Sequence, residues 1–142
     1  MAPSIVAIHL CTKSRMPLRS VREAHAVLQT GLEGDRHAKR DGHRQVLLVA
    51  QEVLDSFGLA AGDIREQLTV RGLDVDGLAP GARLRAGTAR FEVAGPCEPC
   101  ERMNEIRPGL RASLVGRRGR FVRVIGEGTV AVGDELIVEP EN

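Results

Sequence analysis

The sequence predicts a single mainly β domain over residues 1–142, a β-rich α+β fold rolled into a barrel-like sheet. Its apolar runs are short, and the 16 glycines mostly fall between them. Few segments have a helical period, and short strands separated by glycine turns are typical of barrels and rolled sheets. Trp and Tyr are absent and Phe occurs three times, so Val, Leu, Ile and Ala must fill most of the core.

Each expected element follows from its local pattern. Residues 50–57 predict a short helix, because Val53, Leu54 and Phe57 share one face and Gly58 ends it. Residues 104–115 predict one more helix, which Pro108–Gly109 would break or start. Residues 21–30 fit a helix or a strand, residues 31–44 a polar loop, and residues 126–134 a hairpin. The expected strands span residues 4–10, 45–49, 68–70, 83–85, 90–93, 121–125 and 135–138.

Composition excludes several classes of function. No stretch approaches the roughly 20 apolar residues of a membrane span, and no basic run carries the aromatics of a nucleic-acid site. The apolar start lacks a positive region and a cleavage site, which favours a cytoplasmic protein. Three cysteines are an odd count, so free thiols in a reducing compartment are expected. Almost all basic residues are arginines, which fits either a GC-rich genome or anion binding.

The sharpest motif is the turn Pro96-Cys97-Glu98-Pro99-Cys100, which follows the strand expected at 90–93. A thiol in a rigid turn after a strand can face a cleft, and Arg102 can stabilise its thiolate. A helix starting near Asn104 would add its dipole in the same direction. We therefore expect one functional thiolate here, against three alternatives. These are two incidental thiols, a thioredoxin-like dithiol, and a zinc site completed by Cys11, His37 or His43.

Three further segments are candidates for anion binding or for plain surface structure. One is the loop containing Gly34, Asp35, Arg36, His37, Arg40, His43, Arg44 and Gln45. The second is Arg65-Glu66-Gln67, where adjacent residues of a strand face opposite sides. One of the two charges should then be buried, and a structural ion pair is the simplest account. The third is the basic glycine loop at residues 116–121.

In this order the segments resemble the MOSC domain, the C-terminal domain of molybdenum cofactor sulfurases, in its stand-alone bacterial form. The resemblance runs from about residue 4 to residue 139. The segments that carry it are 31–37, 44–46, 64–66, Gly81 with Leu84 and Gly87, 96–100 and 132–134. It implies a barrel-like β fold and a pocket cysteine that carries sulfur or ligates molybdenum. Relatives that reduce N-hydroxylated compounds use a cysteine resembling the second of this pair, which selects Cys100. The family commonly has Arg-Glu-Asn where this chain has Arg65-Glu66-Gln67, so a ligand role for that amide is in doubt.

The expected function is sulfur delivery to a metal–sulfur or molybdenum centre through Cys100, with Cys97 as a resolving thiol that can form a disulfide. One alternative is a molybdenum cofactor-dependent reductase with Cys100 as metal ligand, and another is a non-enzymatic cofactor- or protein-binding module. The molybdenum cofactor (molybdopterin) is the expected ligand, and pyridoxal phosphate is not expected. Expected partners are a sulfur-donor desulfurase or an electron-donor protein. Candidate cofactor-binding residues are Arg36, His37, Arg44, Arg65, Glu66 and Arg102.

Overall fold

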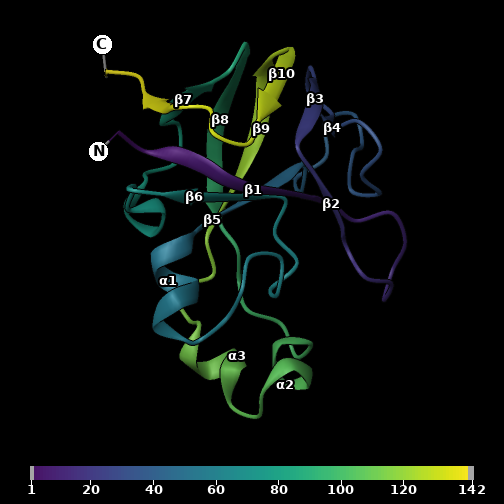
Figure 1. Ribbon diagram of the computed structural model, residues 1–142, viewed down its shortest axis with the longest axis vertical. Helices are drawn as coiled ribbons and strands as arrows, with labels where there is room; N and C mark the ends of the chain where they lie inside the picture. The colour runs from purple at the N-terminus through teal and green to yellow at the C-terminus, as the bar shows by residue number, and fades with distance from the viewer. Residues whose placement is uncertain (1, 141–142) are drawn as a thin grey trace.

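The computed structural model describes residues 2–140 and confirms the mainly β class (Figure 1). The strands of the described chain are β1 (Ser4–Leu10), β2 (Arg19–Val21), β3 (Glu23–Val27), β4 (Gly31–Leu32), β5 (Val46–Ala50), β6 (Leu68–Arg71), β7 (Arg83–Ala86), β8 (Ala89–Pro96), β9 (Arg120–Gly126), β10 (Gly128–Ala131) and β11 (Leu136–Val138). The helices are α1 (Gln51–Ser56), α2 (Met103–Ile106) and α3 (Leu110–Ser113), with a 3-10 turn η1 at Val75–Gly77.

The strands form two sheets that roll around a common core without closing into a barrel. The larger sheet has the order β11-β7-β8-β9-β5-β6-β1-β2, and the smaller has the order β10-β3-β4. Only β5 and β6 pair in parallel among the described strands, and α1 connects them. Backbone hydrogen bonds from Ile5 to Asp134 (2.9 Å) and from Gly133 to Ile5 (2.8 Å) bring β1 against the segment before β11. The roll therefore follows from the twist of the strands and from these added contacts.

Strand β5 is buried on both faces, as its continuous apolar run predicts. Val46 and Leu48 face the first apolar cluster, which lies between the rolled sheets and includes Phe91. Leu47 and Val49 face the opposite way, into a smaller second cluster beneath α1, α2 and α3. The second cluster consists of Leu47, Val49, Leu54, Leu59, Ile64, Met103, Leu110 and Leu114, with Phe57, Cys97 and Phe121 packed against it.

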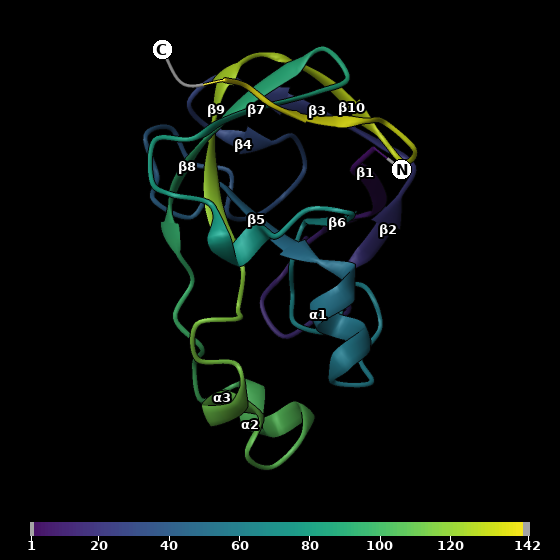
Figure 2. The ribbon, with the colours of Figure 1, turned by 90° about the vertical axis from the view of Figure 1, so that its left-hand side faces the viewer.

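The segment between β8 and β9 forms a helical arm, residues 97–119, which extends away from the sheets (Figure 2). The arm is closed at its base, because the Cys97 N–H donates to the carbonyl of Gly119 at 3.2 Å. Gly119 has a φ of +93°, and a Cβ there would lie 2.3 Å from the carbonyl oxygen of Leu48, so a side chain does not fit. Within the arm the single helix expected at 104–115 is instead two short helices, because Pro108–Gly109 interrupts it, with Gly109 at φ +86°.

The structure also tests the other elements that the sequence predicts. The helix expected at 50–57 is confirmed as α1, and the ambiguous residues 21–30 contain β3 and part of β2. The hairpin expected at 126–134 is wrong, because β10 leaves the large sheet and pairs with β3. A turn in which the Asp134 N–H donates to Ala131 then leads the chain back to β11, which pairs with β7. Within residues 2–140 no helix has the length and apolar character needed to cross a membrane.

Candidate functional site

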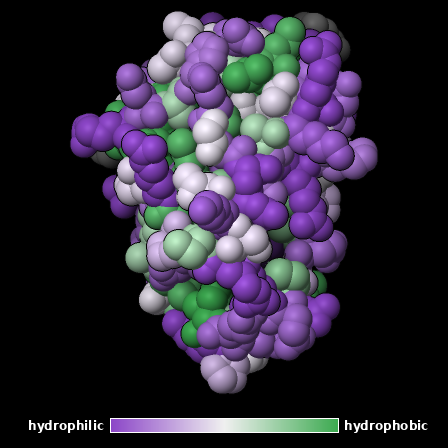
Figure 3. All heavy atoms as spheres, turned by 90° about the vertical axis from the view of Figure 1, so that its right-hand side faces the viewer, coloured by the Kyte–Doolittle hydropathy of each residue, from purple (hydrophilic) through white to green (hydrophobic). Residues whose placement is uncertain are grey.

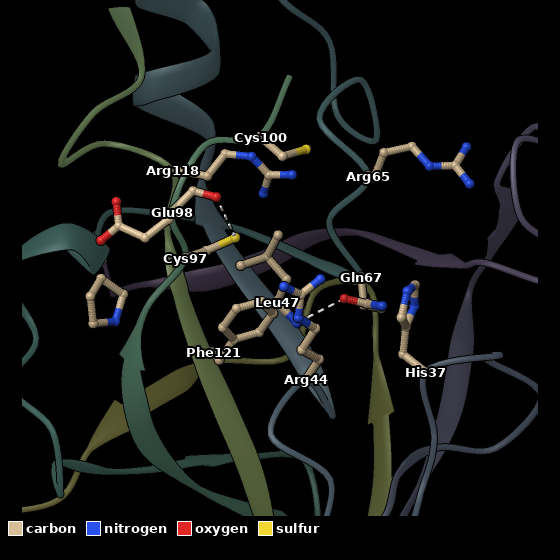
Figure 4. A pocket seen from close by; sticks show the side chains of 11 residues that line it. His37, Arg44, Leu47, Arg65, Gln67, Cys97, Glu98, Cys100, Arg118 and Phe121 are labelled. Carbon is tan, nitrogen blue, oxygen red and sulfur yellow. Dashed lines mark hydrogen bonds between the residues drawn. The ribbon is translucent and has the colours of Figure 1, made fainter. Parts of the chain in front are cut away.

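A cavity of about 270 Å³ opens at the base of the arm, between the Cys97–Cys100 turn and the loop that precedes β5 (Figure 4). One wall is the turn itself with Pro96 and Glu98, and the second cluster contributes Leu47 and Phe121. Three further segments, separate from the turn in sequence, complete the lining. The residues that they contribute are His37, Arg44, Arg65, Gln67 and Arg118.

The two cysteines of the turn differ in their surroundings. Cys97 is half-buried against the second cluster, and its thiol donates to the carbonyl of Glu98 at 3.8 Å. Burial raises the pKa of the Cys97 thiol above its ordinary value, while the guanidinium groups of Arg118 and Arg44 act in the opposite direction. Cys100 is exposed. The cavity therefore has one sheltered thiol and one that a partner in solution can reach.

Arg118 is the buried cation of the site, with a residue exposure of 6%. Its Nε donates to the thioether sulfur of Met103 at 3.3 Å, and its Nη1 is buried without a hydrogen-bond partner. No carboxylate within residues 2–140 forms an ion pair with it under a 4.0 Å limit. Buried polar groups are almost always satisfied in folded proteins. An anion in the cavity would supply the missing acceptor.

A buried polar network holds the wall opposite the cysteines. The carboxylate of Asp35 accepts from the backbone N–H of Cys11 (2.6 Å), from that of His37 (3.0 Å) and from the amide of Gln67 (3.2 Å). The carbonyl of the Gln67 amide in turn accepts from Leu47 N–H at 2.7 Å. The network fixes the loop bearing His37 to β5, and both functional groups of the Gln67 amide have partners within the protein. The amide is therefore a structural link as well as part of the lining.

Arg44 and Arg65 contribute to the cavity in different ways. The Arg44 guanidinium lies over the ring of Phe121, 5.9 Å from its centroid, as a cation–π contact. Arg65 has a left-handed backbone with φ +69°, which is unusual for a residue with a side chain. Its guanidinium donates to the carbonyl of Met16 at 2.7 Å and to the sulfur of Cys11 at 3.2 Å. Arg44 is thus the cation of this wall that keeps its hydrogen-bond donors for a ligand.

The cavity includes some of the predicted site residues and leaves out others. His37, Arg44, Arg65, Cys97 and Cys100 line it together, although they are far apart in the sequence. Arg36, Glu66 and Arg102 are not among its lining residues, so their expected contact with a ligand stays a prediction. Arg36 is exposed and directs Nη1 toward His37 Nε2 at 3.5 Å, and Arg102 is the N-cap of α2.

Glu66 is fully buried and has a structural role. One carboxylate oxygen accepts from the Gly62 N–H and from the Thr69 hydroxyl, both at 2.8 Å. Burial raises the pKa of this carboxyl, although these hydrogen bonds and His9 oppose the shift. The ion pair expected for Arg65 and Glu66 is wrong, because each side chain has other partners.

Sequence reasoning missed Arg118, which lines the cavity with both cysteines and is the charged group that lowers the pKa of Cys97 most. Arg102 was expected to support the Cys100 thiolate because it is close in sequence, but it is not among the lining residues. The available signal was the basic glycine loop at 116–121. Among residues 2–140 no cluster of His, Cys, Asp and Glu is arranged to hold a metal ion by itself, which disfavours the zinc alternative.

The face of the molecule that carries the loop before β5 is mostly hydrophilic, with small separate apolar patches (Figure 3). Arg36, Lys39, Arg40, His43 and Arg44 in this loop are accessible, and none forms an ion pair within 4.0 Å in the described chain. Their unpaired charge makes the approach to the cavity positive, which favours anionic ligands.

Comparison with known proteins gives both a family and a fold. A model of the MOSC domain matches residues 33–137. The YuaD protein from Bacillus subtilis is 19% identical, with a TM-score of 0.84 and coverage of 100% of this chain and 98% of the other. YiiM from Geobacillus stearothermophilus is 21% identical, with a TM-score of 0.78 and coverage of 97% and 75%. YiiM from Escherichia coli is 21% identical, with a TM-score of 0.74 and coverage of 98% and 71%. No curated protein matches the chain. At these identities the solved structures support the fold alone.

Proposed function

The chain belongs to the MOSC domain family, which is associated with the molybdenum cofactor, and on this premise we propose that it is a sulfur carrier. In this proposal Cys100 accepts a sulfur atom as a persulfide and delivers it to a metal–sulfur or molybdenum centre. One observation carries it: the exposed thiol of Cys100 shares a cavity with the buried guanidinium of Arg118, which has no acidic partner within residues 2–140. A reachable thiol suits sulfur uptake, and a nearby cation suits anionic sulfur.

Loading needs no outside oxidant. The Cys100 thiolate attacks the terminal sulfur of a donor persulfide, the donor's S–S bond breaks, and the donor leaves as a thiolate. One S–S bond forms as another is lost, so the number of electrons is unchanged. The donor is a cysteine desulfurase or another persulfide-bearing protein, and the exposure of Cys100 lets such a partner approach.

The cavity also fits the anionic part of a molybdenum cofactor, because the guanidinium groups of Arg118 and Arg44 line it and neither forms an ion pair within residues 2–140. Its volume of about 270 Å³ is near the lower end of the usual range for ligand pockets, roughly 300–1,000 Å³. Arg118, Arg44 and His37 would hold anionic groups, and the Cys100 thiolate is a soft ligand of the kind that binds molybdenum. When bound, the cofactor would supply redox chemistry at its metal.

The buried guanidinium of Arg118 also favours a second candidate function, since the same cation suits the anionic groups of a bound cofactor. In this candidate the chain binds the molybdenum cofactor, Cys100 ligates the metal, and the protein reduces N-hydroxylated compounds with electrons from a partner. Binding without turnover, as in a cofactor-binding module, would use the same residues.

Molybdenum content and the mass of the Cys100 peptide separate these functions. We would purify the protein anaerobically from cells that make the cofactor and from cells that do not. The carrier predicts one extra sulfur on the Cys100 peptide from both cell types when thiols are alkylated at lysis, without stoichiometric molybdenum. Cys100→Ser should abolish this sulfur, and Cys11→Ser, which removes a buried thiol away from the cavity lining, should retain it. Equimolar molybdenum that Cys100→Ser removes would instead establish the second candidate.

A further inference from the structure

We infer that Cys97 discharges the sulfur bound to Cys100, releasing it as hydrosulfide beside Arg118 and leaving a Cys97–Cys100 disulfide. The inference rests on the proposed function, because Cys100 must first be loaded. It adds a thiol-dependent sulfide-releasing activity, assigns Cys97 a role that sulfur uptake does not require, and gives Arg118 a second role.

The first observation is the difference in access between the two thiols. Cys97 packs against the second cluster and donates to the carbonyl of Glu98, whereas Cys100 is exposed. A protein donor therefore reaches Cys100 and not Cys97. A sheltered thiol that stays free while its neighbour is loaded is what an internal discharge step requires.

The second observation is the geometry of the turn. Cys97 and Cys100 are separated by Glu98 and Pro99, and both line the same cavity. Pro99 is buried, which restricts the turn that joins the two thiols. Cys-x-x-Cys spacing permits a disulfide, whose Cα atoms are usually about 4.4–6.8 Å apart.

The third observation is the charge around the Cys97 sulfur. Arg118, Arg44, Glu98 and Cys100 are the charged or titratable groups that act on it. Burial raises the pKa of Cys97, and Arg118 is the charged group that opposes this shift most. Figure 4 shows the Arg118 guanidinium directed into the space between the two cysteines. The guanidinium is thus positioned to stabilise the Cys97 thiolate and the departing hydrosulfide.

The step balances as follows. Cys97 gives its proton to solvent, and the thiolate attacks Sγ of Cys100. The bond between that Sγ and the terminal sulfur breaks, and the terminal sulfur leaves with its proton as HS⁻. The terminal sulfur is reduced and the two cysteines are oxidised to a disulfide. A dithiol reductant, or two monothiols, then returns the pair to the reduced state and is itself oxidised to a disulfide.

A single-turnover experiment tests the inference. Reduced protein is loaded anaerobically with inorganic polysulfide, the excess is removed by rapid gel filtration, and free sulfide and cysteine-peptide masses are followed over time. Wild type should release close to one sulfide per Cys100 persulfide and gain the Cys97–Cys100 disulfide. Cys97→Ser and Cys97→Ala should hold the persulfide at least tenfold longer, with Cys11→Ser behaving as wild type.

The role of Arg118 is tested by a separate measurement. Arg118→Met should slow release per loaded Cys100 persulfide about tenfold, whatever the extent of its loading, and Arg118→Lys should recover part of the rate. Alkylation of Cys97 in the reduced, unloaded wild type should accelerate as pH rises through the alkaline range, because burial raises the pKa of its thiol above the ordinary value. In Arg118→Met this acceleration should move to still higher pH, a change that a merely structural role would not produce.

Two negative outcomes are distinguishable. If Cys97→Ser releases sulfide at the wild-type rate, discharge does not use Cys97, and the inference is overturned while the carrier function stands. If wild type takes up no sulfur on Cys100, the proposed function fails and the inference fails with it. Matching circular dichroism spectra and unfolding midpoints among the variants would show that each result reports on chemistry and not on misfolding.

Discussion

The two apolar clusters on either side of β5 have different roles, one in stability and one at the cavity. The first lies between the rolled sheets and shares no residue with the lining of the cavity. The second is smaller and shares Leu47, Cys97 and Phe121 with it, next to the buried Arg118. Stability increases with the apolar surface that is buried, and the first cluster is the larger of the two. It should therefore contribute most to the free energy of unfolding. The second cluster accepts polar groups that a purely structural core would exclude.

The largest expected effect is in the first cluster. Phe91 is 1% exposed, and Phe91→Ala should lower the free energy of unfolding by about 3–5 kcal/mol, because it leaves a cavity between the sheets. Urea unfolding measures the loss. The variant should keep the wild-type alkylation rate at Cys100 while it remains folded. A changed rate in the folded protein would contradict the separation of the two clusters.

In the second cluster, Leu114→Ala should lower the free energy of unfolding by about 2–4 kcal/mol and also speed alkylation of Cys97. Leu114 belongs to the arm and is fully buried in the second cluster. Its truncation therefore loosens the packing that shelters the Cys97 thiol. Val115→Ala is the matched control, since Val115 is 65% exposed and its truncation should change stability by about 0.5 kcal/mol or less. Equal alkylation rates of Cys97 in the two variants would contradict the inference that this packing protects its thiol.

Arg118→Met should raise the free energy of unfolding by about 1 kcal/mol, because an apolar side chain of similar length replaces a buried charge without an acidic partner. The same change should abolish sulfate binding, used as a probe and measured by calorimetry. Arg85→Met, on the exposed face of β7, should leave both quantities unchanged. A marked loss of stability in Arg118→Met would indicate a structural role for this cation.

The smallest effect concerns Glu66 and the dependence of stability on pH. Burial raises its folded-state pKa above the ordinary value, so the folded state binds this proton more tightly than the unfolded state. Its stabilising contribution is fully present below the unfolded pKa and is lost as pH rises through the folded pKa. Glu66→Gln should therefore gain stability relative to wild type as pH rises from about 4.3, the unfolded pKa of glutamate, toward neutrality. Parallel urea titrations of the two proteins across this range measure the difference in the free energy of unfolding. A difference that does not change with pH would contradict the prediction.

The sequence was informative about strands and less so about the site. Strands follow from local alternation and from glycine, and β1, β5 and β9 lie within a residue or two of their expected bounds. The departure of β10 to the second sheet depends on its pairing with β3, which no local pattern encodes. The Cys97–Cys100 turn was found because its spacing is unusual.

Arg118 was missed because Arg117, Arg118 and Arg120 look alike in the sequence. Arg117 is exposed and stacks on Phe57, Arg118 is buried, and Arg120 bonds to the carbonyl of Leu78. The left-handed Gly119 between them sets these directions, and its conformation depends on the close approach of β5. A difference made by tertiary packing in this way is beyond the reach of local sequence patterns.

The closed base of the arm has an engineering consequence. Because Cys97 and Gly119 are hydrogen-bonded, the chain leaves the sheet and returns to it at neighbouring points. Residues in the outer part of the arm, such as the exposed turn at Pro108–Gly109, could then be lengthened or replaced by a reporter peptide while the strands keep their register. The arm is thus a natural grafting position, adjacent to the thiols but outside the hydrogen-bonded scaffold.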